Sequence, residues 1–406
     1  MRVFAFQGLR YTPRVGDAGP LAAPPYDQIN ESVRDRFHAQ SPQQFVHLTR
    51  PVDPQGGDMY KYATDLHGRW IKEGIIEREG RPALYPYVIE LAGGGRRLGI
   101  CALVGLEDAS VIRPHEQTLD KPLADRLALL SAMHVDLEPV LLLSEDGGRL
   151  DALLHEDLAG TAPLVRHRDA DGNFHVLYRI DNPDRIRQYQ QVLNVPSAIA
   201  DGHHRYKVAQ RFAQERGIRP GTAASAKLAV ITSLDSPALA IEPIHRALRE
   251  PANLARLAGV YSGTETFRGA SGAEFAAAVA AAPQPALGVW ISGREPEIWR
   301  LDPAKVPDVP SAQLVVEIFQ KTILPALGLS PEASTDGTVV YRSSPDELWN
   351  QIASGELGTG FFLPPMQPAE FAAAIADGQL LPPKSTRFMP KVMSGLVWAD
   401  HESQIL

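Results

Sequence analysis

A short polar run between a strand pattern and a helix pattern constrains this chain most. Residues 196–199 read Pro-Ser-Ala-Ile and predict a strand or its end. Apolar residues recur at helical spacing from Val208 to Phe212, and Gly217 supplies a stop. Between them, residues 200–206 read Ala-Asp-Gly-His-His-Arg-Tyr. Asp201 and Gly202 therefore occupy a turn from strand to helix.

This turn admits three chemical interpretations. A helix start presents unused backbone N–H groups and the positive end of the helix dipole, which bind anions. In the first interpretation these N–H groups and Arg205 hold phosphate oxygens, while Asp201 coordinates Mg²⁺ or accepts a proton from an attacking hydroxyl. In the second, Asp201, His203 and His204 ligate a transition metal. In the third, Asp201 and Gly202 only cap the helix and the histidines are solvated.

Two further segments are candidates for chemistry. The first is Arg113-Pro114-His115-Glu116, where a carboxylate and an imidazole stand side by side next to a stiff proline. It can supply a general base or contact a substrate amine; alternatively, it is a surface loop with solvated charges. The second is a lysine and two hydroxyls after two prolines, Lys384-Ser385-Thr386. It suits phosphate binding but lacks the glycines of a P-loop, and the alternative is a solvated basic loop.

Coarse patterns place these motifs in a chain of alternating strands and helices. Expected strands include 44–48, 139–143, 227–233 and 360–363, with hairpins at 83–91/96–106 and 287–291/297–301. Expected helices include 58–77, 125–133, 275–282, 312–327, 346–353 and 368–376. His245 and Arg246 lie in an expected polar turn at 241–246, and are either substrate contacts or structural. The mixture predicts an α/β, or mixed α+β, fold.

Length and composition limit the classes of protein. A chain of 406 residues is expected to form two domains, and composition shifts toward alanine and proline from about residue 252. We therefore expect domains at 1–250 and 251–406. The net charge of -8 argues against a protein that mainly grips nucleic acid. Cys101 is the single cysteine, which excludes an internal disulfide. Neither a signal peptide nor a membrane span is expected, so we predict a cytoplasmic protein.

Five segments occur in an order that resembles a known family. They are residues 24–27 (Pro-Pro-Tyr-Asp), 45–48 (Phe-Val-His-Leu), 112–118 (Ile-Arg-Pro-His-Glu-x-Thr), 200–206 followed by Ala209, and 382–391 (Pro-Pro-Lys-Ser-Thr-x-Phe-x-Pro-Lys). Together they resemble the bacterial and archaeal family catalogued as Domain of Unknown Function 1015. The resemblance spans nearly the whole chain, and it brings little settled biochemistry.

A second resemblance implies a mechanism. Residues 201–205 with Ala209 are similar to the phosphate-binding strand-to-helix motif of the ParB/sulfiredoxin superfamily, including its free-serine kinases. It implies a ParB/sulfiredoxin-like fold for residues 1–250, beside a mixed α/β domain at 251–406 that contributes the Lys384 loop. It also implies that Asp201 is the catalytic or metal-bridging carboxylate, and that Gly202 to Arg205 cradle phosphates. Glu116 is the candidate for a second carboxylate.

The leading hypothesis is a nucleotide-dependent phosphotransferase, a small-molecule kinase, acting on a hydroxylated metabolite such as serine or phosphoserine. Its expected partners are that small molecule and ADP or ATP with Mg²⁺. The residues assigned to it are catalytic Asp201, Glu116 and His204; phosphate-binding Gly202, His203, Arg205, Lys384, Ser385 and Thr386; and substrate-binding Arg113, His115, His245 and Arg246. The alternatives are a non-catalytic nucleotide or anion sensor and a ParB-like protein associated with nucleic acid.

Overall fold

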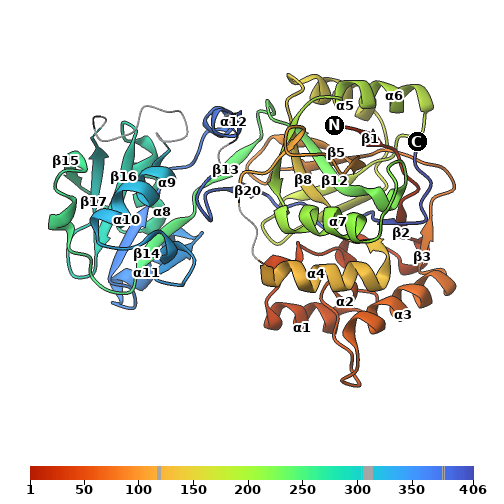
Figure 1. The fold of residues 1–406 in the computed structure, drawn as a ribbon, viewed down its shortest axis with the longest axis horizontal. Coiled ribbons are helices and arrows are strands. Elements are labelled where there is room, and N and C mark those ends of the chain that lie inside the picture. Colours follow the sequence, from red (N-terminus) through yellow and green to blue (C-terminus); the bar gives the residue numbers. More distant parts are fainter. Residues whose placement is uncertain (117–119, 303, 305–313, 377, 379) are drawn as a thin grey trace. The chain divides into compact units, whose positions relative to one another are not determined.

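The chain forms two compact units. The computed structural model describes residues 1–116, 120–302, 304, 314–376, 378 and 380–406 (Figure 1). The first unit comprises Met1–Pro114, Thr118–Leu239 and Pro390–Leu406, and the second comprises His115–Gln117 and Ala240–Met389. The chain enters the longer part of the second unit at Ala240 and returns to the first unit at Pro390. The expected domains at 1–250 and 251–406 stay a prediction. Both units mix strands and helices, as the sequence predicts.

A mixed sheet forms the centre of the first unit. Its order is β6 (Ile112–Arg113), β11 (Ser197–Asp201), β8 (Val140–Ser144), β12 (Ala226–Ser233), β5 (Arg96–Gly105), β4 (Tyr85–Glu90), β10 (Phe174–Leu177) and β9 (Val165–Arg168). β12 runs parallel to β8, and β11 runs parallel to β6. The other neighbours in this order are antiparallel, and β1 (Val3–Phe4) pairs with β5 in the same sense.

Helices cover both faces of this sheet (Figure 1). α5 (Arg149–Leu158) packs on β5 and β12, with α6 (Pro183–Val192) beside it. α7 (His203–Glu215) lies on the opposite face against β8 and β12. Behind α7 follow α4 (Asp120–Met133) and α3 (Met59–Lys72), then α2 (Val46–Thr49) and α1 (Glu31–Gln40). The core under α5 and α6 includes Val88, Leu98, Ile100, Leu142, Leu150, Leu154, Ile186, Tyr189, Ile199 and Ile231.

A smaller sheet forms the centre of the second unit. Its order is β15 (Tyr261–Thr266), β17 (Glu297–Leu301), β16 (Ala286–Ile291), β19 (Thr359–Phe362), β14 (His245–Leu248) and β18 (Val339–Arg342). α8 (Gly272–Ala281) and α11 (Pro345–Ala353) pack together on one face. Phe319, which follows α9 (Val315–Ile318), contacts Phe361 of β19. β13 (Ala240–Glu242) pairs with β20 (Arg387–Met389), and α12 spans Pro368–Ala376.

Most predicted elements are confirmed, two are wrong, and one is too long. The helix expected at 58–77 ends at Lys72, and Ile76–Arg78 form the strand β3. Residues 312 and 313 of the helix expected at 312–327 lie outside the described residues. The hairpins appear as β4/β5 and β16/β17, and the helix expected at 368–376 is α12. The strand expected at 44–48 is instead helical from Val46 to Thr49, because a short apolar run signals burial without fixing the backbone. The polar turn expected at 241–246 instead contains residues of β13 and β14. The described residues include no helix of the length and apolar character needed to cross a membrane.

Candidate functional site

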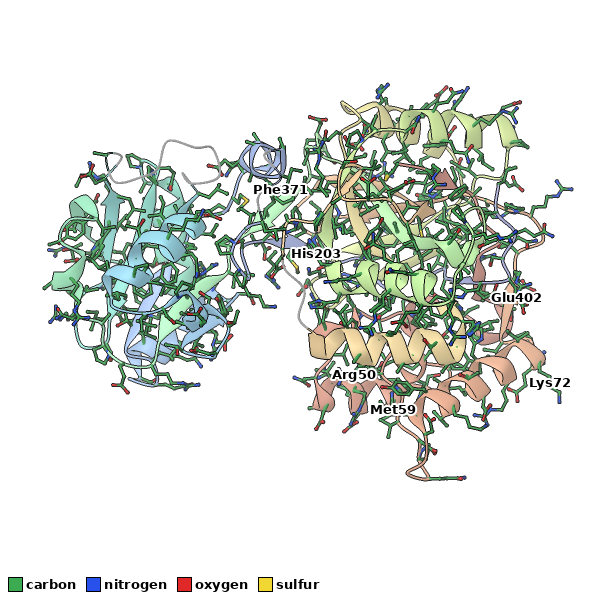
Figure 2. The ribbon with its side chains drawn as sticks, viewed as in Figure 1. Arg50, Met59, Lys72, His203, Phe371 and Glu402 are labelled. Carbon is green, nitrogen blue, oxygen red and sulfur yellow. The ribbon has the colours of Figure 1, made fainter. Side chains whose placement is uncertain are left out.

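The strand-to-helix turn has the geometry that the sequence predicts. β11 ends at Asp201, and Gly202 has φ +92. α7 begins at His203, which is labelled in Figure 2. A Cβ at Gly202 would lie 2.9 Å from Cγ1 of Val140 and 3.0 Å from Cζ of Arg205, so a side chain does not fit. The pairing of β11 with β8 also shifts register just before Asp201, as bulges near functional sites do. The turn therefore aims Asp201 at the start of α7.

Two cations hold the Asp201 carboxylate. Its Oδ1 accepts a hydrogen bond from Nζ of Lys391, and its Oδ2 accepts one from Nη2 of Arg205 at 2.6 Å. Burial favours the neutral acid, but Lys391 and Arg205 outweigh it and lower the pKa of Asp201 to about 2. The side chain of Asp201 is only 17% exposed. The site therefore contains an ionised carboxylate that is largely removed from water.

Further charges surround this pair. Arg205 donates a hydrogen bond to the backbone carbonyl of Pro139, and the nearby Glu138 favours its charged form. Arg97 is buried, and its Nη2 donates to the carbonyl of Pro390 at 2.6 Å. Burial lowers the pKa of Arg97 to about 10, although the charge of Asp201 partly offsets this. Arg97, Arg205 and Lys391 thus bring three positive charges within electrostatic reach of one aspartate.

The Pro-Pro-Tyr-Asp segment contributes to the same region of the first unit. The backbone N–H of Tyr26 donates to Oε1 of Glu138 at 2.9 Å. The guanidinium of Arg126 lies 4.3 Å above the ring of Tyr26, a cation–π contact. Burial raises the pKa of Glu138, while Arg205 and Arg126 oppose that shift. This segment therefore helps to fix the buried carboxylate that faces Arg205.

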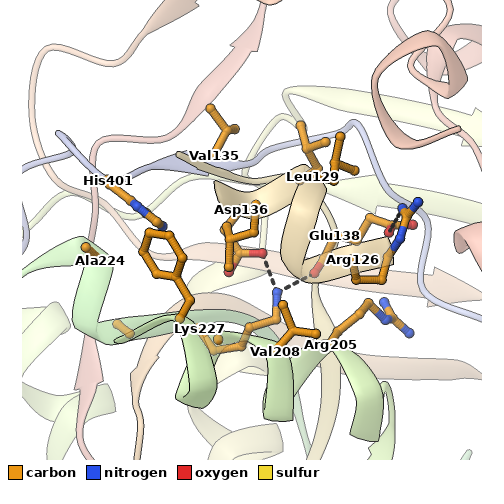
Figure 3. A pocket seen from close by; sticks show the side chains of 15 residues that line it. Arg126, Leu129, Val135, Asp136, Glu138, Arg205, Val208, Ala224, Lys227 and His401 are labelled. Atoms are coloured by element: carbon orange, nitrogen blue, oxygen red, sulfur yellow. Dashed lines mark hydrogen bonds and ion pairs between the residues drawn. The ribbon is translucent and has the colours of Figure 1, made fainter. Parts of the chain in front are cut away.

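A small cavity lies between α4 and α7 (Figure 3). Charged groups on its wall include Lys227, whose Nζ pairs with Asp136 and donates to the carbonyl of Glu138 at 2.7 Å. Its volume is about 50 Å³. Ligand pockets usually measure roughly 300 Å³ or more, so this cavity suits a few waters rather than a nucleotide. The turn at Asp201 is the candidate of the first unit because of its charged groups and not because of a cavity volume.

In the second unit, two predicted segments meet. Nε2 of His115 lies 2.8 Å from Oγ1 of Thr386, across 271 residues of sequence. Oε1 of Glu116 accepts a hydrogen bond from the backbone N–H of Lys384 at 3.0 Å. The ring of His115 packs edge-on against Phe371 at 5.0 Å between centroids. His115 and Glu116 therefore form one loop cluster with the Pro-Pro-Lys-Ser-Thr segment.

His245 and Arg246 contact the protein's own backbone. Nη2 of Arg246 donates to the carbonyl of Lys384 at 3.0 Å, which supports the loop cluster. Nδ1 of His245 accepts a hydrogen bond from the N–H of Leu363 at 3.2 Å. Burial lowers the pKa of His245 to about 4 and that of Arg246 to about 10. Their expected contact with substrate stays a prediction.

The predicted site residues divide between the two units. Arg113, Asp201, Gly202, His203, His204 and Arg205 lie in the first, whereas His115, Glu116, His245, Arg246, Lys384, Ser385 and Thr386 lie in the second. Arg113 forms an ion pair with Glu145. A composite site that uses residues of both units stays a prediction, as do the individual catalytic and binding roles.

Sequence reasoning missed the residues that hold Asp201 and Arg205. Lys391 stood within the quoted segment 382–391, but no local pattern linked it to an aspartate 190 residues earlier. Arg97 lies within the hairpin expected at 96–106 and Glu138 lies just before the strand expected at 139–143, and neither shows a distinguishing local signal. Among the residues that the structure describes, no three His, Cys, Asp or Glu side chains are grouped to hold a metal ion. This finding gives no support to the transition-metal interpretation.

The chain is similar to one protein family and to several solved structures. The family model described as "Protein of unknown function (DUF1015)" matches residues 3–284. A conserved hypothetical protein from Pyrococcus furiosus is 14% identical, with 74% of this chain and 94% of that chain covered and a TM-score of 0.38. A free serine kinase in complex with AMP is 16% identical, with 74% and 91% covered and a TM-score of 0.38. No curated protein matches the chain. At these TM-scores the likeness assigns no activity to this chain.

Proposed function

The chain belongs to the family described as protein of unknown function DUF1015, and we propose that it is a nucleotide-dependent phosphotransferase acting on a small hydroxylated metabolite. The observation that carries this proposal is the largely buried, ionised Asp201 just before α7, held by Lys391 and Arg205. A helix N-terminus beside several cations suits phosphate oxygens, and a carboxylate there suits a hydroxyl donor. This turn therefore offers both groups that phosphoryl transfer needs, a site for phosphate oxygens and a carboxylate for the acceptor hydroxyl.

Each group has a distinct role in the proposed reaction. The backbone N–H groups at the start of α7 bind phosphate oxygens, and Lys391 neutralises the charge on the transferred group. The acceptor hydroxyl donates its hydrogen bond to Asp201. The acceptor oxygen then bonds to phosphorus while the bond from phosphorus to the nucleotide's bridging oxygen breaks. The nucleotide leaves with that electron pair, and the hydroxyl proton passes to Asp201.

Asp201 acts in this scheme mainly by orienting the acceptor. Lys391 and Arg205 lower its pKa to about 2, so it is a weak base. Phosphoryl transfer proceeds through a loose transition state in which the attacking oxygen needs little proton removal at first. Serine, as the acceptor, and phosphoserine, as its phosphorylated form, are the substrate pair that we propose, with ADP or ATP as the nucleotide.

The surroundings of Asp201 do not fit a direct Mg²⁺ ligand. Each of its carboxylate oxygens already accepts a hydrogen bond from a cationic side chain. A divalent cation bound to this carboxylate would be repelled by the positive charges of Lys391 and Arg205. No step of the proposed reaction is therefore assigned to a metal bound by Asp201.

The proposal is tested by turnover of Asp201→Asn, which keeps the shape of the side chain and removes its charge. We expect loss of phosphoryl transfer from ATP or ADP to serine, measured by ³¹P NMR, with the folded content unchanged by circular dichroism. Asp146→Asn is the matched control, because Asp146 is also buried in the first unit and bonds Ser144 and the N–H of Leu150. Normal turnover in Asp201→Asn would refute the assignment.

A specific observation also favours a second function, a nucleotide or anion sensor without turnover. A carboxylate held between two cations at a pKa of about 2 is better suited to organising positive charge than to removing protons. A sensor would bind nucleotide and show no transfer to any hydroxyl acceptor in the same ³¹P assay. Transfer at any rate that Asp201→Asn abolishes would exclude it.

A further inference from the structure

A short segment near the carboxyl end delivers Lys391 to the site. We call residues Pro390–Ser394 the C-terminal strap. Its first residue accepts a hydrogen bond from Arg97, and the N–H of Met393 donates to the hydroxyl of Tyr87 at 3.1 Å. Ser394 exchanges two backbone hydrogen bonds with Ala23, at 2.8 and 3.0 Å. The strap is therefore anchored on both sides of Lys391.

The anchor at Tyr87 is the end of a buried polar chain. The Tyr87 oxygen lies 2.6 Å from Nδ1 of His175, and Nε2 of His175 lies 3.0 Å from Oδ2 of Asp169. Because Tyr87 accepts the N–H of Met393, its own hydrogen can be donated to Nδ1 of His175. The neutral ring then donates from Nε2 to Asp169. Every bond from Asp169 to the strap thus has one donor and one acceptor.

The sheet fixes these residues on one face. His175 of β10 and Arg97 of β5 both stand opposite Ile89 of β4. Tyr87 lies two residues from Ile89 on the same strand, so its side chain shares that face. Tyr87, His175 and Arg97 are all buried, and burial lowers the pKa of His175, which favours its neutral form. Asp169 opposes this shift, while Arg97 and His167 add to it.

A buried polar chain is costly unless its groups are satisfied, and at its Tyr87 end this chain is completed by the N–H of Met393 in the strap. We propose that Asp169, His175 and Tyr87 are positioning residues that act through Lys391. They hold the strap so that Nζ of Lys391 stays at Oδ1 of Asp201. The expected effect of these residues on phosphate binding rests on the proposed function. Their expected effect on the stability of the strap does not.

Hydrogen exchange tests the strap directly. Tyr87→Phe removes the acceptor of the Met393 N–H and keeps the ring. We expect exchange of the backbone amides of residues 391–394 to become roughly fivefold faster, as the loss of one hydrogen bond predicts. Tyr85→Phe is the matched control on the same strand, because its hydroxyl accepts from Gly8 and not from the strap. Equal exchange rates in wild type and Tyr87→Phe would overturn the proposal.

Binding of pyrophosphate and ADP tests the action through Lys391. We expect Lys391→Met to weaken binding about tenfold, as loss of a charged hydrogen bond does. Tyr87→Phe should weaken it roughly threefold alone and not at all in a Lys391→Met background. The same threefold loss in both backgrounds would show a general structural effect and overturn the proposal. If the wild type binds neither probe, the proposed phosphate site fails, whereas faster strap exchange in Tyr87→Phe would still support the strap.

Discussion

Replacing Lys391 by methionine is the sharpest perturbation of the candidate site. It removes one of the two cations on Asp201 and keeps most of the apolar stem. A pKa of about 2 for Asp201, against roughly 3.9 in an unfolded chain, corresponds to about 2.5 kcal/mol of stability near neutral pH. Breaking a fully buried ion pair costs roughly 3–5 kcal/mol, but Arg205 stays at 2.6 Å and shares the charge. We therefore expect a loss of about 1–3 kcal/mol in Lys391→Met.

The pH dependence of the unfolding free energy also reports on the ion pair between Lys391 and Asp201. The folded-state pKa of Asp201 is depressed, so its contribution is fully present above about pH 4 and is lost as pH falls toward 2. Without Lys391 the folded pKa moves up toward its unfolded value. The unfolding free energy of Lys391→Met should therefore depend less steeply on pH between 4 and 2 than that of the wild type.

Urea unfolding at several pH values measures both effects. Lys61→Met is the matched control, because Lys61 and Asp65 form an ion pair with side chains that are 73% and 59% exposed. Water screens such a pair, so this control should leave the stability curve unchanged within error. If Lys391→Met behaves like Lys61→Met at every pH, the buried ion-pair account of Asp201 is refuted.

Two other predictions follow from particular backbone and side-chain environments. Gly202→Ala should destabilise the first unit by more than Gly217→Ala, by at least about 1 kcal/mol in urea unfolding. Both glycines have positive φ, but only at Gly202 would the Cβ meet Val140 and Arg205 closely. For His245, burial lowers the folded pKa to about 4 from a usual 6.5, so the unfolded chain binds the proton first. Stability should fall by up to about 3 kcal/mol from pH 6.5 to 4, and His245→Gln should flatten that decline in the same assay; equal slopes in wild type and variant would contradict this.

Local chemistry explains why the turn at Asp201 and several elements could be predicted. Gly202 adopts a backbone conformation that glycine favours, and the helical spacing of Val208 and Phe212 places buried residues on α7. The antiparallel pairing of β4 and β5 follows strand patterns on both sides of a glycine-rich turn. In each case the signal lies within a few residues of the element that it specifies.

Long-range pairing explains what could not be predicted. Asp201 and Lys391 are 190 residues apart, and nothing in either neighbourhood indicates the other. His115 and Thr386 are a similar case, although both stood in segments singled out by sequence. The segment at 45–48 was misread because Phe45 is buried against Gly395 and Trp398 of the returning chain, a tertiary contact. The apolar residues of this segment therefore reflect its burial and do not indicate a strand.

Ligand-dependent melting tests the central claim most directly, namely that the turn between β11 and α7 binds the phosphates of a nucleotide. We would measure the melting temperature with ADP, ATP, CTP, pyrophosphate, serine and phosphoserine, each with and without Mg²⁺, because a ligand of the native state raises it by mass action. The account predicts a rise with a nucleotide or pyrophosphate that persists in Lys61→Met and is strongly reduced in Lys391→Met. No rise with any phosphate compound, or an equal rise in both variants, would contradict it.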